Sequence, residues 1–261
     1  MNLIVERQDH VATVTLNRPE HLNALNIDLM KEIEETALSF RDDLETRVVI
    51  FTGAGKHFSG GRDLKDLATI RPGEGSVLAR QRQQHMGPRI ISALRGMNQV
   101  TIAAINGAAL GGGACMVSAL DFRIGSEDCV VGYPEGTLGI PLSWASLPLC
   151  VHLVGPARTK RMMILAQKED AQTLLGWGFL DEVVSREALM TRAVELAEIY
   201  AAQPPVAAQM IKRSVNAYVS ALDRAVMHMD SDQVMLAQAT EDFKEGVQAF
   251  FEKRDPHFKG R

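Results

Sequence analysis

Strands and helices alternate in the hydrophobic pattern of the first part of the chain. Residues 11–16 alternate apolar side chains with threonine, which predicts a half-buried strand. Apolar residues recur every three or four positions over residues 27–40, as in an amphipathic helix, and Asn26 is suited to cap its start. Residues 47–53 form an apolar run that ends at Gly53, which is typical of a strand covered on both faces.

The same order of elements then repeats. Residues 101–105 predict another buried strand, followed by a glycine-rich turn and an apolar segment over residues 114–120 that suits a helix. Residues 121–124 and 129–132 predict two further strands. Proline and glycine within residues 69–84 predict a mobile surface loop. We therefore expect an α/β fold whose strands are mainly parallel.

The last third of the chain differs from this alternation. Its segments are rich in helix-forming residues and are separated by glycine or proline. This pattern predicts helices over residues 157–167, 187–202, 206–218 and 231–252.

Composition limits the classes of function. The 261 residues include 28 Lys and Arg against 32 Asp and Glu, so the net charge is −4 and nucleic-acid binding has no support. Three cysteines without paired spacing indicate neither a disulfide framework nor a zinc site. No export signal begins the sequence, and the apolar stretch at residues 100–120 is interrupted by Asn106 and glycines. We expect a cytoplasmic protein with one main domain, no metal and no membrane contact.

Nucleotide-binding motifs are not complete. Gly53-Ala54-Gly55-Lys56 lacks the spacing of a phosphate loop, and His57 follows the lysine where that loop has Ser or Thr. The glycines of residues 107–113 do not follow the dinucleotide-binding pattern. ATP and NAD are therefore not supported as cofactors.

Two glycine-rich turns each follow a predicted buried strand, at residues 57–64 and 106–114. Glycine lets backbone N–H groups point into a ligand site, where a pair of them can stabilise an oxyanion. A helix that begins near Gly112 would add its positive dipole end. The alternative is that both turns only pack a helix onto a sheet.

A lone acidic residue is the third candidate for chemistry. Glu135 stands among apolar and small residues within residues 132–141. Burial would raise its pKa toward neutrality and suit it to proton transfer, whereas most isolated glutamates are simply solvated.

These segments together resemble the enoyl-CoA hydratase/isomerase, or crotonase, superfamily, and the resemblance extends over nearly the whole chain. The matching segments are Asn17-Arg18-Pro19 with Leu22 to Leu25, Phe58 to Leu64, Ala104 to Gly113, Asp121 to Ile124, and Pro134-Glu135 with Leu138-Gly139. The resemblance implies an α/β crotonase-like spiral of ββα units over residues 1–200. It also implies a helical C-terminal trimerisation region over residues 201–261, in a homotrimer or homohexamer.

The resemblance also implies a substrate and a site. The substrate is an acyl-CoA thioester, so coenzyme A enters as part of the substrate and no separate cofactor is expected. The oxyanion donors resemble the backbone N–H groups of Arg62 and Gly112, and Glu135 matches the catalytic acid and base. Backbone groups of Leu22, Ala24, Arg62 and Gly112 are expected to contact the coenzyme A thioester.

Cys115 departs from the family's hydratases, which resemble this chain but carry a first glutamate just after the glycine triplet. With Glu135 alone, the pattern is similar to single-glutamate 3,2-enoyl-CoA isomerases, and Leu142 to Trp144 would make a drier pocket. Cys115 itself is expected to be a buried apolar residue and not a nucleophile. The alternatives are a hydratase or related lyase, assisted by Tyr133 or Ser143, and a non-catalytic acyl-CoA-binding protein.

Overall fold

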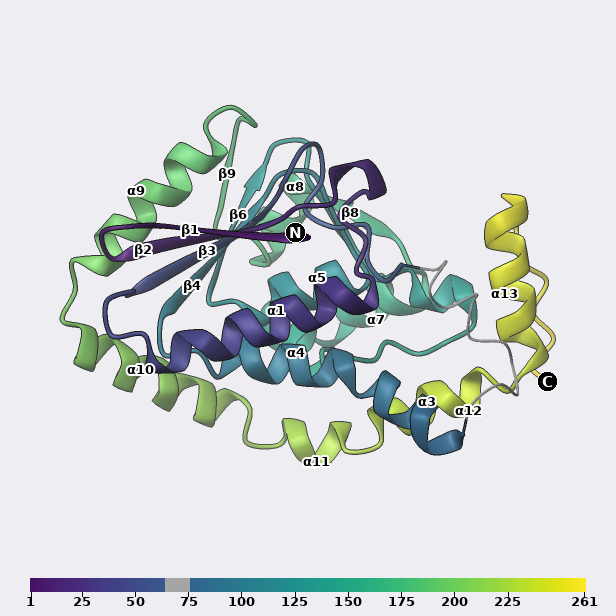
Figure 1. Ribbon diagram of the computed structural model, residues 1–261. Helices are drawn as coiled ribbons and strands as arrows, with labels where there is room; N and C mark the ends of the chain where they lie inside the picture. The colour runs from purple at the N-terminus through teal and green to yellow at the C-terminus, as the bar shows by residue number, and fades with distance from the viewer. Residues whose placement is uncertain (64–75) are drawn as a thin grey trace.

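Two β-sheets organise the chain, which the computed structural model describes over residues 1–63 and 76–261 (Figure 1). In the larger sheet the first two strands are antiparallel and every later neighbour is parallel. Its order is β1 (Leu3–Gln8), β2 (Val11–Leu16), β3 (Val48–Gly53), β4 (Val100–Ile105), β6 (Phe122–Ser126) and β9 (Glu182–Val184). The smaller sheet has the order β5 (Ala108–Leu110), β7 (Val130–Gly132) and β8 (Lys168–Asp170).

The chain passes repeatedly from one sheet to the other. Strand β4 lies in the larger sheet and β5 in the smaller, and helix α5 (Gly112–Ala119) then leads to β6 and β7, which repeat the step. Strand β8, helix α8 (Ala171–Trp177) and β9 complete the last turn. This is the expected α/β spiral of ββα units, so the fold class is confirmed. The first predicted glycine turn follows β3, and the second includes β5 and leads into α5.

Local sequence signals explain most of the predicted elements. Helix α1 (Ile27–Ser39) starts where Asn26 accepts a hydrogen bond from the Leu29 N–H at 2.9 Å, so the predicted cap is confirmed. Its apolar stripe packs on helix α4 (Met86–Arg95), and both belong to the main hydrophobic core. Strand β3 is buried along its whole length, as its uninterrupted apolar run predicts.

Two expectations about residues 69–84 and 231–252 are corrected. Residues 77–84 form helix α3 (Val77–Gln84), because Ser76 caps a run of helix formers that contains no glycine or proline; residues 69–75 lie outside the described residues. Residues 231–252 form two helices, α12 (Asp230–Ala237) and α13 (Glu241–Glu252), because the Thr240 hydroxyl caps a new start.

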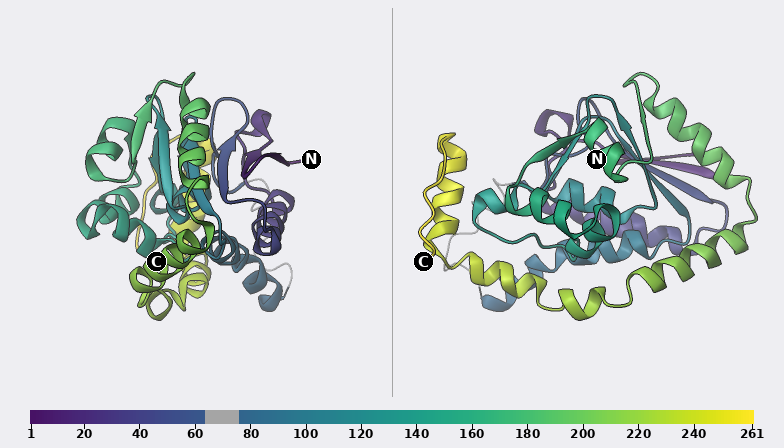
Figure 2. Two further views of the ribbon diagram at one scale, coloured as in Figure 1. Left: turned by 90° about the vertical axis from the view of Figure 1, so that its left-hand side faces the viewer. Right: turned by 180° about the vertical axis from the view of Figure 1, so that it is seen from behind.

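The C-terminal helices follow the outside of the core. Helix α9 (Leu189–Ala201) covers the face of β3, β4 and β6. Helices α10 (Pro205–Val219), α11 (Asp223–Met227) and α12 then run along one edge of the molecule, and α13 stands at the far end (Figures 1 and 2). The remaining elements are α6 (Leu147–Val154), α7 (Pro156–Ile164), and the 3-10 helices η1 (Pro19–His21), η2 (Phe40–Asp42) and η3 (Pro134–Leu138).

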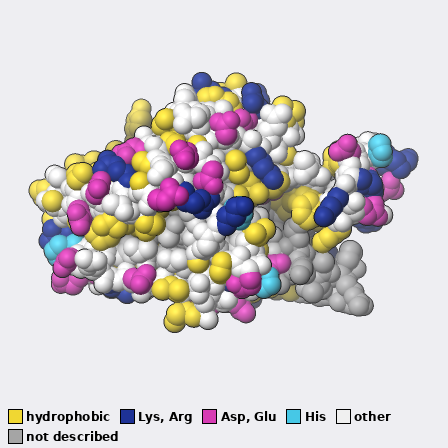
Figure 3. Space-filling view, turned by 90° about the horizontal axis from the view of Figure 1, so that it is seen from above, with side chains coloured by type: hydrophobic (Ala, Val, Ile, Leu, Met, Phe, Trp, Pro, Cys, Tyr) yellow, Lys and Arg dark blue, Asp and Glu magenta, His cyan; other side chains and the backbone are white. Residues whose placement is uncertain are grey.

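Surface properties agree with the low net charge. On the face shown in Figure 3, Lys and Arg side chains are interspersed with Asp and Glu. Within the described residues, no helix combines the length and the apolar character needed to cross a bilayer.

Candidate active site

The two predicted glycine turns lie side by side. The Ser59 N–H donates to the Ala108 carbonyl at 3.0 Å, and the Leu110 N–H donates to the Ser59 carbonyl at 2.9 Å. This parallel pairing joins segments that are fifty residues apart in the sequence. The two turns therefore do not act only as separate contacts between a helix and a sheet. They are hydrogen-bonded to each other and form a single structural unit.

The backbones of Gly61 and Gly111 approach each other closely where the two turns meet. Both residues have positive φ, at 91° and 50°. A Cβ on Gly61 would lie 2.7 Å from the Leu110 carbonyl oxygen and 3.6 Å from the Gly111 Cα. Only glycine combines this backbone conformation with such a close approach. Arg62 and Gly112 follow these glycines, and both neighbour Leu25: Leu25 pairs with Arg62, and a Cβ on Gly112 would lie 2.9 Å from Leu25 Cδ1.

A buried hydrogen-bond network holds the first turn. The Ser59 hydroxyl donates to the Asn23 carbonyl at 2.8 Å and accepts from the Gly61 N–H at 3.2 Å. The Asn23 side chain, also buried, donates to the His57 carbonyl at 2.7 Å. These supporting roles of Ser59 and Asn23 were not predicted. The feature of the sequence that indicates them is a small hydroxyl residue directly before two glycines.

The segment expected to contact coenzyme A runs beside this turn. Leu22 is 55% exposed, and its carbonyl accepts the Gly60 N–H at 2.8 Å. The Leu25 N–H donates to the Gly61 carbonyl at 2.8 Å, which pairs this segment with Arg62. The Ala24 carbonyl accepts a hydrogen bond from the Arg18 guanidinium. The structure thus brings Leu22, Ala24 and Arg62 together at one surface.

Helix α5 begins at the second turn. The first N–H groups of a helix have no acceptor within it and carry partial positive charge. Within the described residues the Gly112 N–H donates to no protein acceptor, while the Cys115 N–H closes the first turn on the Gly111 carbonyl at 2.9 Å. The start of α5 therefore offers an N–H group close to the turn that contains Gly61.

Glu135 lies against this pair of turns. It stands in the first turn of η3, and a Cβ on Gly111 would be 2.9 Å from its Oε1. Its Oε2 is buried and has no hydrogen-bond partner among the described residues. Burial raises the pKa of Glu135 to about 7. A carboxyl with this pKa both accepts and donates protons near neutral pH.

Two neighbouring groups that sequence reasoning considered are neutral. Cys115 is 1% exposed, and burial, with Glu135 nearby, raises the pKa of its thiol well above the usual value. The expectation of a buried apolar residue is confirmed, because a protonated and inaccessible thiol is a poor nucleophile. Tyr133 is fully buried, hydrogen-bonded to the Ser118 hydroxyl at 2.6 Å, and burial raises its pKa well above the usual value.

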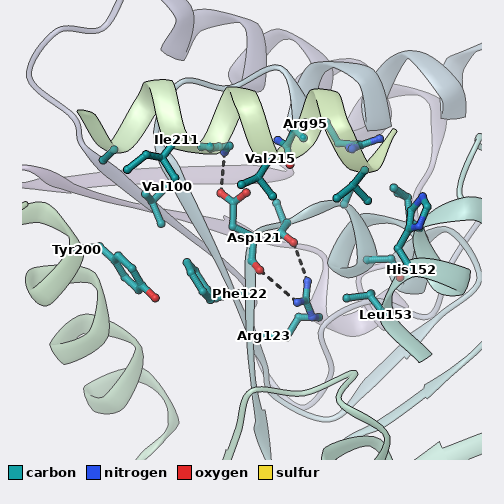
Figure 4. A pocket seen from close by; sticks show the side chains of 18 of the residues that line it. Arg95, Val100, Asp121, Phe122, Arg123, His152, Leu153, Tyr200, Ile211 and Val215 are labelled. Atoms are coloured by element: carbon teal, nitrogen blue, oxygen red, sulfur yellow. Dashed lines mark hydrogen bonds and ion pairs between the residues drawn. The ribbon is translucent and has the colours of Figure 1, made fainter. Parts of the chain in front are cut away.

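A large apolar cavity lies elsewhere in the molecule. It has a volume of about 580 Å³ and lies between α10 and the N-terminal ends of β4 and β6. Figure 4 shows Ile211 and Val215 of α10 facing Val100 and Asp121 across it. Neither Glu135 nor the two glycine turns line this cavity. Within the described residues no cluster of His, Cys, Asp and Glu could hold a metal ion.

Comparisons with known proteins show what the whole chain is similar to. A profile of the enoyl-CoA hydratase/isomerase family matches residues 6–261. The short-chain-enoyl-CoA hydratase of Clostridium acetobutylicum is 34% identical over 97% of this chain and 95% of its own. A crystal structure of an enoyl-CoA hydratase/isomerase from Xanthobacter autotrophicus superposes with a TM-score of 0.89 at 26% identity, covering 100% of this chain and 99% of that chain. A monofunctional enoyl-CoA isomerase from M. smegmatis has a TM-score of 0.71 at 29% identity, covering 84% and 93%.

Proposed function

Because this chain belongs to the enoyl-CoA hydratase/isomerase family, we propose that it shifts the double bond of a 3-enoyl-CoA to the 2-position, with Glu135 as acid and base. One observation supports this most strongly. The Glu135 carboxylate has a buried, unpartnered oxygen and lies directly beside the glycine turn that begins α5.

The two turns would stabilise the charge that forms on the thioester. The thioester oxygen accepts hydrogen bonds from the N–H groups of Arg62 and Gly112, and the dipole of α5 adds to their effect. Loss of one such donor typically slows an enzyme by ~10²–10³. Because the donors belong to the backbone, the side chain of Arg62 does not alter this role.

Glu135 then moves one proton between two carbons. Its carboxylate takes a proton from C2 of the 3-enoyl thioester, and the electrons of that C–H bond delocalise over C2, C4 and the thioester oxygen as a dienolate. The same carboxyl returns the proton to C4, which leaves the double bond between C2 and C3. A pKa of about 7 suits both halves of this step.

Cys115 favours isomerisation over hydration. It occupies the position where the family's hydratases carry their first glutamate, and its thiol is buried and neutral. A neutral thiol cannot replace a carboxylate that activates water. Hydration of a 2-enoyl-CoA by Glu135 alone is the second candidate, because the relative from C. acetobutylicum is named a short-chain-enoyl-CoA hydratase.

Coenzyme A would bind along the segment beside the first turn. The proposal places backbone groups of Leu22, Ala24, Arg62 and Gly112 against the bound thioester. The exposure of Leu22 and the pairing of Leu25 with Arg62 support this position. Isothermal titration with coenzyme A and with an acyl-CoA would measure how much each half of the ligand contributes.

Residues 201–261 would serve assembly into a homotrimer or homohexamer. Helices α10 and α11 expose large apolar side chains, among them Tyr218 at 86% and Val226, and Leu222 between the two helices is exposed as well. A surface of this kind suits contact with another subunit. Light scattering coupled to size exclusion gives the assembly, and a monomer at micromolar concentration would contradict this part of the proposal.

The decisive experiment follows proton positions. The purified protein is incubated with but-3-enoyl-CoA in deuterated buffer, and the products are followed by NMR. Formation of 2-enoyl-CoA without 3-hydroxyacyl-CoA would support the isomerase, and the share of deuterium at C4 would show how often the proton on Glu135 exchanges with solvent before it is returned. Rapid accumulation of the 3-hydroxy product would replace isomerisation by hydration as the main activity. Binding without any exchange at C2 would indicate a non-catalytic acyl-CoA-binding protein.

A further inference from the structure

The indole of Trp144 lies between helices α4 and α5, directly beside the proposed oxyanion donor. A Cβ on Gly112 would lie 2.7 Å from Trp144 Cη2, so the six-membered ring touches the start of α5. A Cβ on Gly87 of α4 would lie 2.3 Å from Cγ and Cδ1, at the opposite end of the indole. The side chain fits only because both helices have glycine where they meet it. Trp144 is 8% exposed, so it is fixed within the core.

The backbone at Trp144 has an uncommon conformation. Trp144 and Ala145 are consecutive non-glycine residues with positive φ, at 73° and 52°. Such residues persist only where the surrounding structure determines them strongly, and they concentrate at functional sites.

Asp230 of α12 supplies this restraint. Its Oδ2 accepts the Ala145 N–H at 2.8 Å, and its Oδ1 is buried without a hydrogen-bond partner among the described residues. The Ser146 hydroxyl donates to the Trp144 carbonyl at 3.0 Å. Asp230 is 4% exposed, although it is a charged residue from a C-terminal helix. The buried carboxylate thus fixes the direction in which the indole points.

We propose that Trp144 determines which acyl groups the site accepts, and that Asp230 is the residue that positions it. This inference rests on the proposed function. A thioester oxygen bound at Gly112 places the first acyl carbons beside the indole, and the rigid ring closes the space between α4 and α5. Short, compact acyl groups fit in front of it, whereas a long straight chain would have to displace it.

Replacing the indole tests this directly. Trp144→Ala removes the barrier, so the ratio of kcat/KM for dec-3-enoyl-CoA to that for but-3-enoyl-CoA should rise ~10–100-fold, as expected when a hydrophobic pocket gains room for methylene groups. Trp177→Phe is the matched control, because Trp177 lies on α8 beneath the guanidinium groups of Arg158 and Arg161. An unchanged ratio in an active Trp144→Ala protein would overturn the proposal.

Fluorescence gives a second readout that does not depend on turnover or on a folded alanine variant. The chain has two tryptophans, so Trp177→Phe leaves Trp144 as the only indole. Combined with Glu135→Gln, which prevents reaction, this protein should change its emission when but-3-enoyl-CoA binds and not when coenzyme A alone binds. Binding seen by calorimetry without any change in emission would refute the role of Trp144. Absence of all acyl-CoA binding would instead refute the proposed function.

Asp230 is tested by two substitutions. Asp230→Ala removes the acceptor of the Ala145 N–H, and the chain-length ratio should move toward that of Trp144→Ala. Asp230→Asn keeps a carbonyl oxygen at this place and should restore the wild-type ratio and the Trp144 emission. Equal ratios in wild type and Asp230→Ala would show that Asp230 does not position the indole.

Discussion

Gly111 and Glu135 are in direct apposition: a Cβ on Gly111 would lie 2.9 Å from Glu135 Oε1. The contact joins the start of α5 to η3, two segments that the smaller sheet brings together through β5 and β7. The residue that turns the chain into α5 therefore also sets the distance between the proposed base and the proposed oxyanion donors. This relationship makes Gly111 a sensitive position for activity.

Gly111→Ala is expected to lower kcat by about 10²-fold, because displacement of a catalytic group by about 1 Å has an effect of this size. The added methyl meets Oε1, and the positive φ strains the backbone as well. Gly176→Ala is the matched control, since a Cβ there meets no atom within 4 Å and alanine suits helix α8. Steady-state kinetics on both variants checks this; equal activity would contradict the proposed placement of Glu135.

Glu135→Gln is expected to lower the isomerase rate by at least ~10²–10⁴, the usual contribution of a general acid–base residue. In the wild type, only the ionised carboxylate can take the first proton. Because its pKa is about 7, kcat/KM should fall tenfold per pH unit below that value and level off above it. Glu187→Gln, at an exposed position, should leave the profile unchanged. A wild-type profile that is flat from pH 5 to 8 would exclude Glu135 as the base.

The same substitution should stabilise the folded protein at alkaline pH. The pKa of Glu135 rises from 4.5 in its ordinary state to about 7 when folded, so ionisation favours the unfolded chain. This penalty is absent below pH 4.5, grows as pH rises to 7, and stays constant above. At about 1.4 kcal/mol per pKa unit, Glu135→Gln should raise the free energy of unfolding by about 1–3 kcal/mol at pH 8 and leave it unchanged at pH 4. Urea denaturation at both pH values measures the difference.

None of the three cysteines should react with a thiol reagent while the protein is folded. All are buried, and burial raises the pKa of each thiol. Ellman's reagent should therefore count no thiol under native conditions and three in urea. Cys115→Ala should keep the isomerase activity and lower the stability by about 0.5–3 kcal/mol, as is common for core substitutions. Complete loss of activity in a folded Cys115→Ala protein would show instead that the Cys115 thiol is needed for the reaction.

Periodicity predicted β2, β3, β4, β6, β7 and α1 well, because a buried strand or an amphipathic helix depends mainly on its own sequence. The short parallel strands β5 and β9 were not predicted. The turn glycines and Glu135 could also be selected from the sequence, and the structure brings them together. The contact between Gly111 and Glu135 could not be predicted from spacing, because it depends on how β5 and β7 pair.

The contacts of Trp144 and Asp230 could not be predicted from the sequence. The indole depends on glycines in two different helices, and Asp230 comes from a helix 85 residues further along the chain. No local pattern marks such a contact. Helix α3 was not predicted because of a local signal. The proline and glycines before Ser76 indicated a loop, and the predicted loop also covered the residues that form α3.

The close contact between α13 and η3 connects the C-terminal region to Glu135. A Cβ on Gly246 would lie 2.7 Å from the Leu138 carbonyl carbon and 2.9 Å from its Cα, and neither backbone atom can give way easily. Gly246→Ala should therefore shift α13 away from η3 and lower the stability by about 1–3 kcal/mol, the usual effect of overpacking. Because η3 carries Glu135, kcat should fall as well.

Gln248→Ala is the matched control for this contact, because Gln248 lies on the same helix with its side chain exposed. Alanine is a good helix former at both positions, so a difference between the variants reports the contact and not helix propensity. Hydrogen exchange should increase in residues 134–138 of Gly246→Ala alone. If exchange increases there while kcat is unchanged, the position of Glu135 does not depend on α13.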